Sequence, residues 1–224
     1  MNTPLRLSPI DAALRSLQGH WGEVNGMPTL MHRPRAAHWP VGIADLSSLT
    51  RFGVKGANAA AWLSQQGIPV PQRPNTWRSL PPGGLVARLG LTEFLIEDGL
   101  SSNVAPQLAA RCQTPPARVY PVLRQDLALA LVGDRTQELL RQTCSVNFQA
   151  VDVSQHPVVL TSMIGVTVTI IPTEMAGQLV YRLWCDGTFG TYFWKTLIEM
   201  ATELGGGAIG VEQVPFNTAS ERGV

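Results

Sequence analysis

The sequence predicts an α+β fold with two similar lobes, each an antiparallel or mixed sheet with covering helices. Two observations predict it. Short runs such as residues 166–170 alternate apolar and polar side chains, which is the period of a half-buried strand. Other runs, such as residues 193–204, place apolar side chains three or four positions apart, which is the period of a helix. The two kinds of run alternate along 224 residues, enough chain for one or two compact lobes.

The first 40 residues are predicted to form a helix and a connector. Ser8 precedes Pro9, and Asp11 follows in what would be the first turn, a pattern typical of a helix start with Ser as the N-cap. Apolar residues then recur at helical spacing until Gly19, where we expect the helix to end. The proline-containing residues 33–40 would connect it to the main domain, residues 41–204.

The first lobe of this domain is predicted to contain two strands, a helix, a hairpin and a second helix. These elements are expected, in that order, at residues 41–56 with a turn near Ser47 and Ser48, at 58–66, at 83–96 and from Val104 to Cys112. Gly67 and the prolines that follow it end the first helix. Pro115 and Pro116 are the best internal boundary, so we place the division between the lobes near residue 115.

The second lobe repeats this pattern in outline. Its predicted elements are a strand at residues 127–134, a helix at 135–144, strands at 158–162, 165–171 and 179–185, and a long final helix that ends at Gly205. Asp134 and Gln137 have the spacing of a capping box for the first of these helices. Residues 205–224 contain few apolar anchors and are expected to be a mobile tail, or one ordered only against a partner.

Composition excludes several classes of function. The net charge is +1 and the basic residues are scattered singly, which argues against nucleic acid and acidic membranes as partners. No apolar run is long enough for a membrane span, and no signal peptide is evident. The three cysteines and four histidines have no metal-site spacing, so we expect no bound metal and reduced thiols in a cytoplasmic protein. Only 15% of residues are charged, which favours a chain that covers part of its surface with a partner.

No nucleophile motif, phosphate-binding loop or dinucleotide fingerprint occurs, so no residue is a catalytic candidate. Asp45 can orient a ligand amine or cap a turn, and we favour the turn. The arginines at predicted strands can bind carboxylate or phosphate, or lie in solvent or at an interface. The final helix carries too many aromatic rings for one core-facing stripe, so core packing and a partner or pocket are both open. The candidates for a ligand pocket or an interface are Asp45, Arg51, Arg88, Arg124, Phe189, Tyr192 and Trp194.

Four stretches together resemble the gamma subunit of heterotetrameric sarcosine oxidase, a relative of the glycine-cleavage T-protein, which is an aminomethyltransferase. They are ADLSSLTRFGVKGANAAAWL (44–63), GGLVARLGLTEFLI (83–96), PVLRQDLALALVGDRTQELLRQTCSVNF (121–148) and GTFGTYFWKTLIEMA (187–201). The match lies in the order and spacing of these stretches, since each is degenerate alone. The related N-methylglutamate dehydrogenase complex is similar enough to be an alternative.

The resemblance implies a T-protein-like, folate-binding-type fold in a subunit that binds no cofactor itself. It implies that FAD, FMN, NAD and tetrahydrofolate are bound by larger flavoprotein subunits, in a cytoplasmic complex that oxidises sarcosine or a related N-methylated amino acid. Arg88 stands where aminomethyltransferases carry an acidic residue, and a cation cannot accept the hydrogen bonds of an ammonium group. We therefore expect a non-catalytic structural subunit. The alternatives are a stand-alone folate-binding protein and an aminomethyltransferase-like one-carbon transferase.

Overall fold

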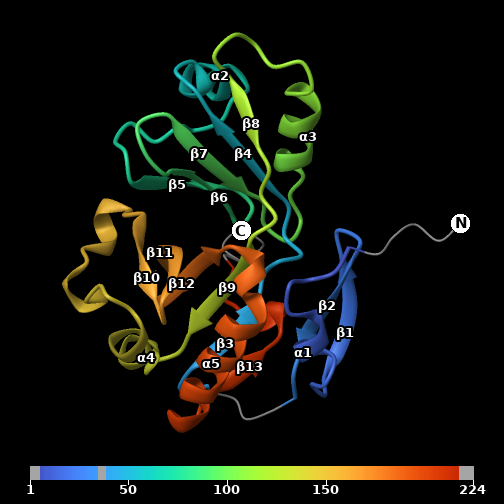
Figure 1. Cartoon of the computed structure of the whole chain (residues 1–224), viewed down its shortest axis with the longest axis vertical. Helices are drawn as coiled ribbons and strands as arrows, with labels where there is room; N and C mark the ends of the chain where they lie inside the picture. Colours follow the sequence, from blue (N-terminus) through green and yellow to red (C-terminus); the bar gives the residue numbers. More distant parts are fainter. Residues whose placement is uncertain (1–5, 35–38, 217–224) are drawn as a thin grey trace, which may run out of the picture. The chain divides into compact units, whose positions relative to one another are not determined.

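The chain divides into two units, each with one main β-sheet and helices of its own. A computed structural model describes residues 6–34 and 39–216 (Figure 1). Unit 1 comprises Met1–Ser48, Asp126–Val151 and Leu160–Val224, and unit 2 comprises Leu49–Gln125 and Asp152–Val159. Each unit combines one main sheet with helices, which confirms the predicted α+β class with antiparallel and mixed sheets.

Unit 2 contains a five-stranded antiparallel sheet in the order β5-β6-β7-β4-β8. Its strands are β4 (Arg51–Lys55), β5 (Thr76–Leu80), β6 (Gly84–Arg88), β7 (Glu93–Glu97) and β8 (Tyr120–Val122), and its helices are α2 (Ala59–Gln65) and α3 (Val104–Arg111). The predicted hairpin at residues 83–96 and the two predicted helices are confirmed. A short 3-10 turn, η2 (Val153–Gln155), belongs to the second segment of the unit.

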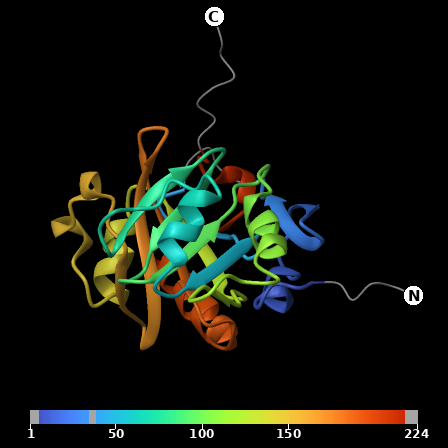
Figure 2. The same cartoon turned by 90° about the horizontal axis from the view of Figure 1, so that it is seen from above.

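The core of unit 2 lies between this sheet and its two helices. Both helices lie on the same side of the sheet, where their buried side chains meet those of β4, β6 and β7 (Figures 1 and 2). Trp62 of α2 packs against Phe52 of β4 with ring centroids 5.9 Å apart. Leu108 of α3 and Phe94 of β7 are 1% and 0% exposed. The apolar periodicity that predicted the helices therefore marks the face that they bury.

Unit 1 contains a six-stranded sheet in the order β10-β11-β12-β9-β3-β13. Its strands are β3 (Gly42–Asp45), β9 (Leu127–Val132), β10 (Val159–Met163), β11 (Val166–Met175), β12 (Gln178–Cys185) and β13 (Gly207–Ile209). All strands predicted for the second lobe are present. The β11–β12 hairpin turns through Ala176 and Gly177, both with positive φ, and is drawn in orange in Figure 2. Every residue of β9 is buried, as expected of a central strand.

The helices of unit 1 are α1 (Asp11–Leu14), α4 (Thr136–Thr143) and α5 (Gly190–Glu203), with 3-10 turns η1 (Phe148–Ala150), η3 (Gly187–Phe189) and η4 (Val211–Gln213). The predicted N-terminal helix is thus only one turn long. Helix α4 has Arg135 as its N-cap residue, and the side chain of Arg135 makes no capping hydrogen bond. Gln137 of the predicted capping box donates to the hydroxyl oxygen of Tyr181 at 3.2 Å. Helix α5 buries Phe193, Leu197 and Ala201 along one stripe.

The description of residues 1–40 as a helix and connector needs correction. After α1 the chain forms a β-hairpin from β1 (His20–Val24) and β2 (Met27–His32). Asn25 and Gly26 make its two-residue turn with φ values of 51° and 75°, the conformation that a type I′ turn requires. Residues 35–38 of the predicted connector lie outside the described residues.

The predicted boundary near residue 115 differs from the division seen here. Pro115 and Pro116 lie in the loop between α3 and β8, and β8 still pairs with β4, so the chain leaves unit 2 only after Gln125. The predicted tail also contains ordered structure, since β13 pairs in parallel with β3. Residues 217–224 of that tail lie outside the described residues. Within the described chain, no helix has the length and apolar character to cross a membrane.

Candidate functional site

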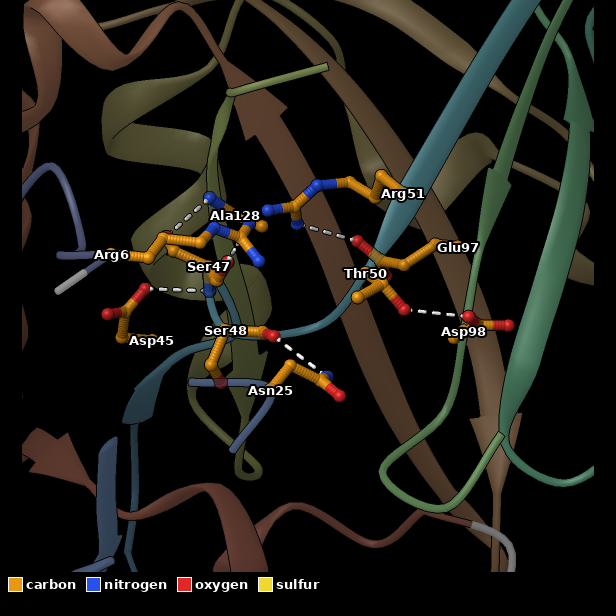
Figure 3. A network of polar contacts seen from close by, with 10 residues as sticks. All are labelled: Arg6, Asn25, Asp45, Ser47, Ser48, Thr50, Arg51, Glu97, Asp98 and Ala128. Atoms are coloured by element: carbon orange, nitrogen blue, oxygen red, sulfur yellow. Dashed lines mark hydrogen bonds and ion pairs between the residues drawn. The ribbon is translucent and has the colours of Figure 1, made fainter. Parts of the chain in front are cut away.

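Arg51 belongs to a buried ion pair in unit 2. It begins β4, and its cross-strand neighbour on β7 is Glu97. The guanidinium Nη1 lies 2.9 Å from Oε2 of Glu97, and the two side chains are 1% and 0% exposed (Figure 3). No solvent can reach this pair to exchange a ligand. Arg51 therefore stabilises the sheet by pairing with Glu97. It does not bind the carboxylate or phosphate of a ligand, which was one of the roles considered from the sequence.

The residue after Glu97 caps a helix. The buried carboxylate of Asp98 accepts hydrogen bonds from the backbone N–H groups of Val104 and Ala105, both at 3.0 Å, and from the hydroxyl of Thr50 at 2.7 Å. The first two are the N-terminal amides of α3, which have no acceptor within the helix. Figure 3 shows Thr50 and Asp98 facing each other across the strand ends. This carboxylate orders unit 2 and is occupied by its three donors.

Asp45 stabilises a turn in unit 1. It ends β3, and its Oδ1 accepts a hydrogen bond from the N–H of Ser47 at 2.9 Å. The Ser47 hydroxyl in turn accepts from the N–H of Ala128 at 3.2 Å, and the carbonyl of Ser48 accepts from Nδ2 of Asn25 at 3.0 Å (Figure 3). These contacts agree with the turn interpretation favoured from the sequence.

Arg88 binds two loops together. Its guanidinium stacks over the ring of Phe94 and donates four hydrogen bonds, all to backbone carbonyl oxygens. The acceptors are those of Pro71 at 3.3 Å, Gln72 at 2.7 Å, Gly90 at 3.2 Å and Leu91 at 2.6 Å. A guanidinium that is used in this way holds the loops after α2 and between β6 and β7. A guanidinium has no acceptor, so Arg88 can neither take up a proton as a base nor replace the carboxylate of the related transferases.

The remaining candidates have separate environments. Arg124 forms an ion pair with Glu93 of β7 in unit 2. In unit 1, Trp194 faces the core and is 5% exposed, whereas Phe189 and Tyr192 are 48% and 53% exposed. The Tyr192 hydroxyl donates to the carbonyl of Ile164 at 3.0 Å. The seven candidates are thus divided between the two units, with Asp45, Phe189, Tyr192 and Trp194 in unit 1 and Arg51, Arg88 and Arg124 in unit 2.

A cleft that sequence reasoning missed lies in unit 1. It has a volume of about 620 Å³, within the range of small-molecule sites. Its lining comes from the end of β9, the start of α4, the β11–β12 turn and the segment around β13. The lining residues are Trp39, Val132, Gly133, Asp134, Thr136, Gln137, Gly177, Gln178, Leu179, Tyr181, Ile209 and Gln213. The only features of the sequence that point to this region are the turn residues Gly133-Asp134 and Ala176-Gly177. They predict loops, but they do not predict a cavity.

The cleft provides hydrogen-bond groups rather than a nucleophile. Burial raises the pKa of Tyr181, and the hydrogen bond from Gln137 offsets part of this effect. Tyr181 therefore keeps its proton at neutral pH, and because its oxygen already accepts from Gln137, that proton can be donated to another acceptor. Asp134 adds a carboxylate at the rim. This arrangement can bind a polar small molecule but contains no activated nucleophile.

Two of the three cysteines, Cys112 and Cys185, are poorly suited to catalysis. Burial raises the pKa of Cys112, and burial together with the carboxylates of Asp126 and Asp186 raises the pKa of Cys185 to about 12. A thiol with so high a pKa is protonated at neutral pH, and it is the thiolate that acts as nucleophile. Among the described residues, no group of three His, Cys, Asp or Glu side chains could hold a metal ion.

The glycine run 205–207 does not fit a phosphate group. A Cβ on Gly206 would lie 2.2 Å from the carbonyl oxygen of Val41, so the protein's own backbone fills the space beside it. Gly207 donates its N–H to that same carbonyl at 2.9 Å and starts β13. At the start of the segment leading into α5, Asp186 accepts from the N–H of Thr188 at 2.8 Å and caps η3.

Comparison with solved structures places this fold. The chain is similar to the glycine cleavage system aminomethyltransferase T from Bartonella henselae, with a TM-score of 0.72 and 14% identity over 93% of this chain. It spans 60% of that protein's length. It is also similar to a chain of the heterotetrameric sarcosine oxidase from Corynebacterium sp. U-96, with a TM-score of 0.64 and 20% identity. That match covers 89% of this chain and 96% of the other.

These likenesses establish the T-protein-like fold that the resemblance implied. At 14% and 20% sequence identity, these matches show similarity of the fold alone. No family model matches the sequence. No curated protein matches it either.

Proposed function

We propose that this chain is a non-catalytic subunit of a multi-chain flavoenzyme complex that oxidises sarcosine or a related N-methylated amino acid. The observation that carries the proposal is the extent of the two structural matches. The chain corresponds to 96% of a chain from a heterotetrameric sarcosine oxidase, but to only 60% of an aminomethyltransferase. The chain matches nearly the full length of one subunit of an assembly, but only part of the aminomethyltransferase chain. This difference favours the role of a subunit. The resemblance of the four sequence stretches supports the gamma subunit in particular.

The use of the polar side chains supports a structural role. Arg88, at the position where the related transferases carry an acid, holds backbone carbonyls. Asp98 caps α3 and Arg51 is paired with Glu97, so these charged groups stabilise unit 2 instead of facing a substrate. The raised pKa of Cys185 removes a further nucleophile. Oxidation by this complex would then take place on partner chains, which would hold FAD, FMN, NAD and tetrahydrofolate.

Exposed aromatic rings support contact with a partner. Phe189 and Tyr192 at the start of α5 leave about half of their surface open, at 48% and 53%. Aromatic residues are enriched where protein surfaces meet, because they contribute large apolar area at little cost in side-chain entropy. A cytoplasmic complex agrees with three free cysteines.

The test is purification of the tagged chain from its native host, followed by the visible spectrum of the eluate and oxidation assays with sarcosine and other N-methylated amino acids. The matched control is the same chain produced alone in a foreign host. We expect larger partners, bound flavin and amine oxidation only in the native preparation. A colourless monomer from both hosts would contradict the proposal.

The cleft in unit 1 favours a second candidate, a stand-alone folate-binding module or one-carbon transferase. Its volume of about 620 Å³ and the hydroxyl of Tyr181 could accommodate a polar ligand. Titration of the isolated chain with tetrahydrofolate would separate the candidates. A ligand at a hundredfold excess over its Kd stabilises the folded state by about 2.7 kcal/mol, so a bound folate would raise the Tm. Tyr181→Phe should abolish the rise if the cleft is the site, and formaldehyde transfer would distinguish a transferase from a binding module.

A further inference from the structure

One end of the unit 2 sheet exposes both apolar and basic side chains. Lys55 ends β4, and its register partner on the edge strand β8 is Tyr120. Leu91 lies in the turn between β6 and β7, beside the start of β7 that pairs with the same end of β4. Leu91 is 76% exposed and Tyr120 is 55% exposed. We call this surface the basic end, defined by Lys55, Leu91, Arg118 and Tyr120.

The basic end is a continuous and rigid platform. The N–H of Gly56 donates to the carbonyl of Thr92 at 3.0 Å, which fixes the β6–β7 turn against the end of β4. The N–H of Asn58 donates to the carbonyl of Arg118 at 3.2 Å. Gly56 has a φ of 126°, and a Cβ there would lie 2.1 Å from the Arg118 carbonyl, so this approach requires glycine. Arg88 holds the backbone of Leu91 from the other side.

The charge of unit 2 is unbalanced at its surface. Its two segments contain eight lysines and arginines against four aspartates and glutamates, a formal net charge of +4. Glu97 and Asp98 are fully buried and Glu93 is paired with Arg124, so little negative charge remains outside. Among the described residues, exposed Lys55 and Arg118 form no ion pair.

We propose that the basic end is a docking surface for an acidic partner protein, which receives Leu91 and Tyr120 in an apolar depression flanked by carboxylates facing Lys55 and Arg118. This inference rests on the proposed function as a subunit. Apolar and tyrosine side chains at the centre with charges at the rim form the usual anatomy of a protein interface. A nucleic acid backbone is charged and would offer no apolar surface for the exposed side chain of Leu91 to contact. Pro121 lacks an N–H on the edge strand, so contact is through side chains and not through an added strand.

The experiment uses the full chain, tagged and purified from its native host at low and at high salt. The variants are Lys55→Glu with Arg118→Glu, and Tyr120→Ala; the control is Arg141→Glu on α4, an exposed charge reversal in unit 1. We expect the double charge reversal and Tyr120→Ala each to weaken retention of the flavin-bearing partner about tenfold. Wild type and the control should retain it equally and lose it progressively with added salt.

Four outcomes are distinguishable. Loss of the flavin-bearing partner in both basic-end variants, with unchanged thermal unfolding, supports the docking surface. Retention in those variants as in Arg141→Glu overturns it and leaves the proposed function intact. Absence of any flavin-bearing partner with the wild-type chain overturns the proposed function and the docking surface with it. Release of bound nucleic acid by Lys55→Glu with Arg118→Glu, seen in the ultraviolet spectrum, overturns the assignment to an acidic protein.

Discussion

Replacing Asp98 by alanine should destabilise unit 2 strongly, because one carboxylate satisfies three donors. The change leaves the first two amides of α3 and the Thr50 hydroxyl without their acceptor. Loss of a helix cap costs about 0.5–2 kcal/mol, and a buried donor left unsatisfied costs about 1–3 kcal/mol. We therefore expect the free energy of unfolding to fall by about 3–5 kcal/mol. Thr50→Val, which removes only one of the three hydrogen bonds, should lower it by about 1.5 kcal/mol.

The assay is urea denaturation followed by circular dichroism, with hydrogen exchange at the amides of Val104 and Ala105 as the local measurement. The matched control is Asp152→Ala. Its carboxylate also accepts a backbone N–H, from Ser154 at 3.0 Å, but lies in solvent, where water can replace it. The control should leave the urea midpoint unchanged. The reasoning is refuted if Asp98→Ala is no less stable than Asp152→Ala, or if the two α3 amides keep their protection.

Three further predictions follow from other contacts. Arg51→Met should lower the free energy of unfolding by about 3–5 kcal/mol, because it removes the cation that lies 2.9 Å from the buried carboxylate of Glu97; adding Glu97→Leu should recover most of the loss in the same urea assay. In a variant whose other two cysteines are serine, Cys185, with a pKa of about 12, should react with a thiol reagent at pH 8 far more slowly when folded than in urea, and equal rates would contradict this. Gly206→Ala should cost about 1–3 kcal/mol because its Cβ overlaps a backbone carbonyl, whereas Gly90→Ala, with open space around it, should be near neutral by Tm.

The elements set by local pattern could be predicted from the sequence. Residues 166–170 alternate in polarity and lie within β11, and β6 and β7 form the hairpin predicted at residues 83–96. The helix periodicity beginning at Val104 corresponds to α3. In each case the signal lies in neighbouring residues, and the same residues become the buried face. For these elements, the sequence pattern predicts both the type of secondary structure and the face that is buried.

Elements set by distant partners could not be predicted in this way. Strand β13 exists because Gly207–Ile209 pairs with residues 42–44 of β3, more than 160 residues earlier in the chain. Its glycines look only like the end of a helix when the partner is unknown. The β1–β2 hairpin is different, because Asn25-Gly26 between two apolar runs is a strong local signal that should have predicted it.

For the candidate residues too, roles that depend on nearby residues could be predicted, and roles that depend on distant residues could not. That Asp45 caps a turn was predictable, since its acceptor oxygen reaches a residue two positions away. The role of Arg88 was not, because its four carbonyl partners come from two loops whose meeting depends on the tertiary fold. The cleft was missed for the same reason: Tyr181 and Asp134 come together only through the pairing of β9 with β12.

The interleaving of the two units has a consequence for synthesis. Strand β3 leaves the ribosome early, but its neighbour β9 follows about 80 residues later and β13 near the end of the chain. At about 5–20 residues per second, β3 waits several seconds for β9 and longer for β13. During this interval its unpaired backbone is open to other chains. The intervening segment of unit 2 is complete except for residues 152–159, so it can become compact first, and the nascent chain should depend on chaperones most while β3 is unpaired.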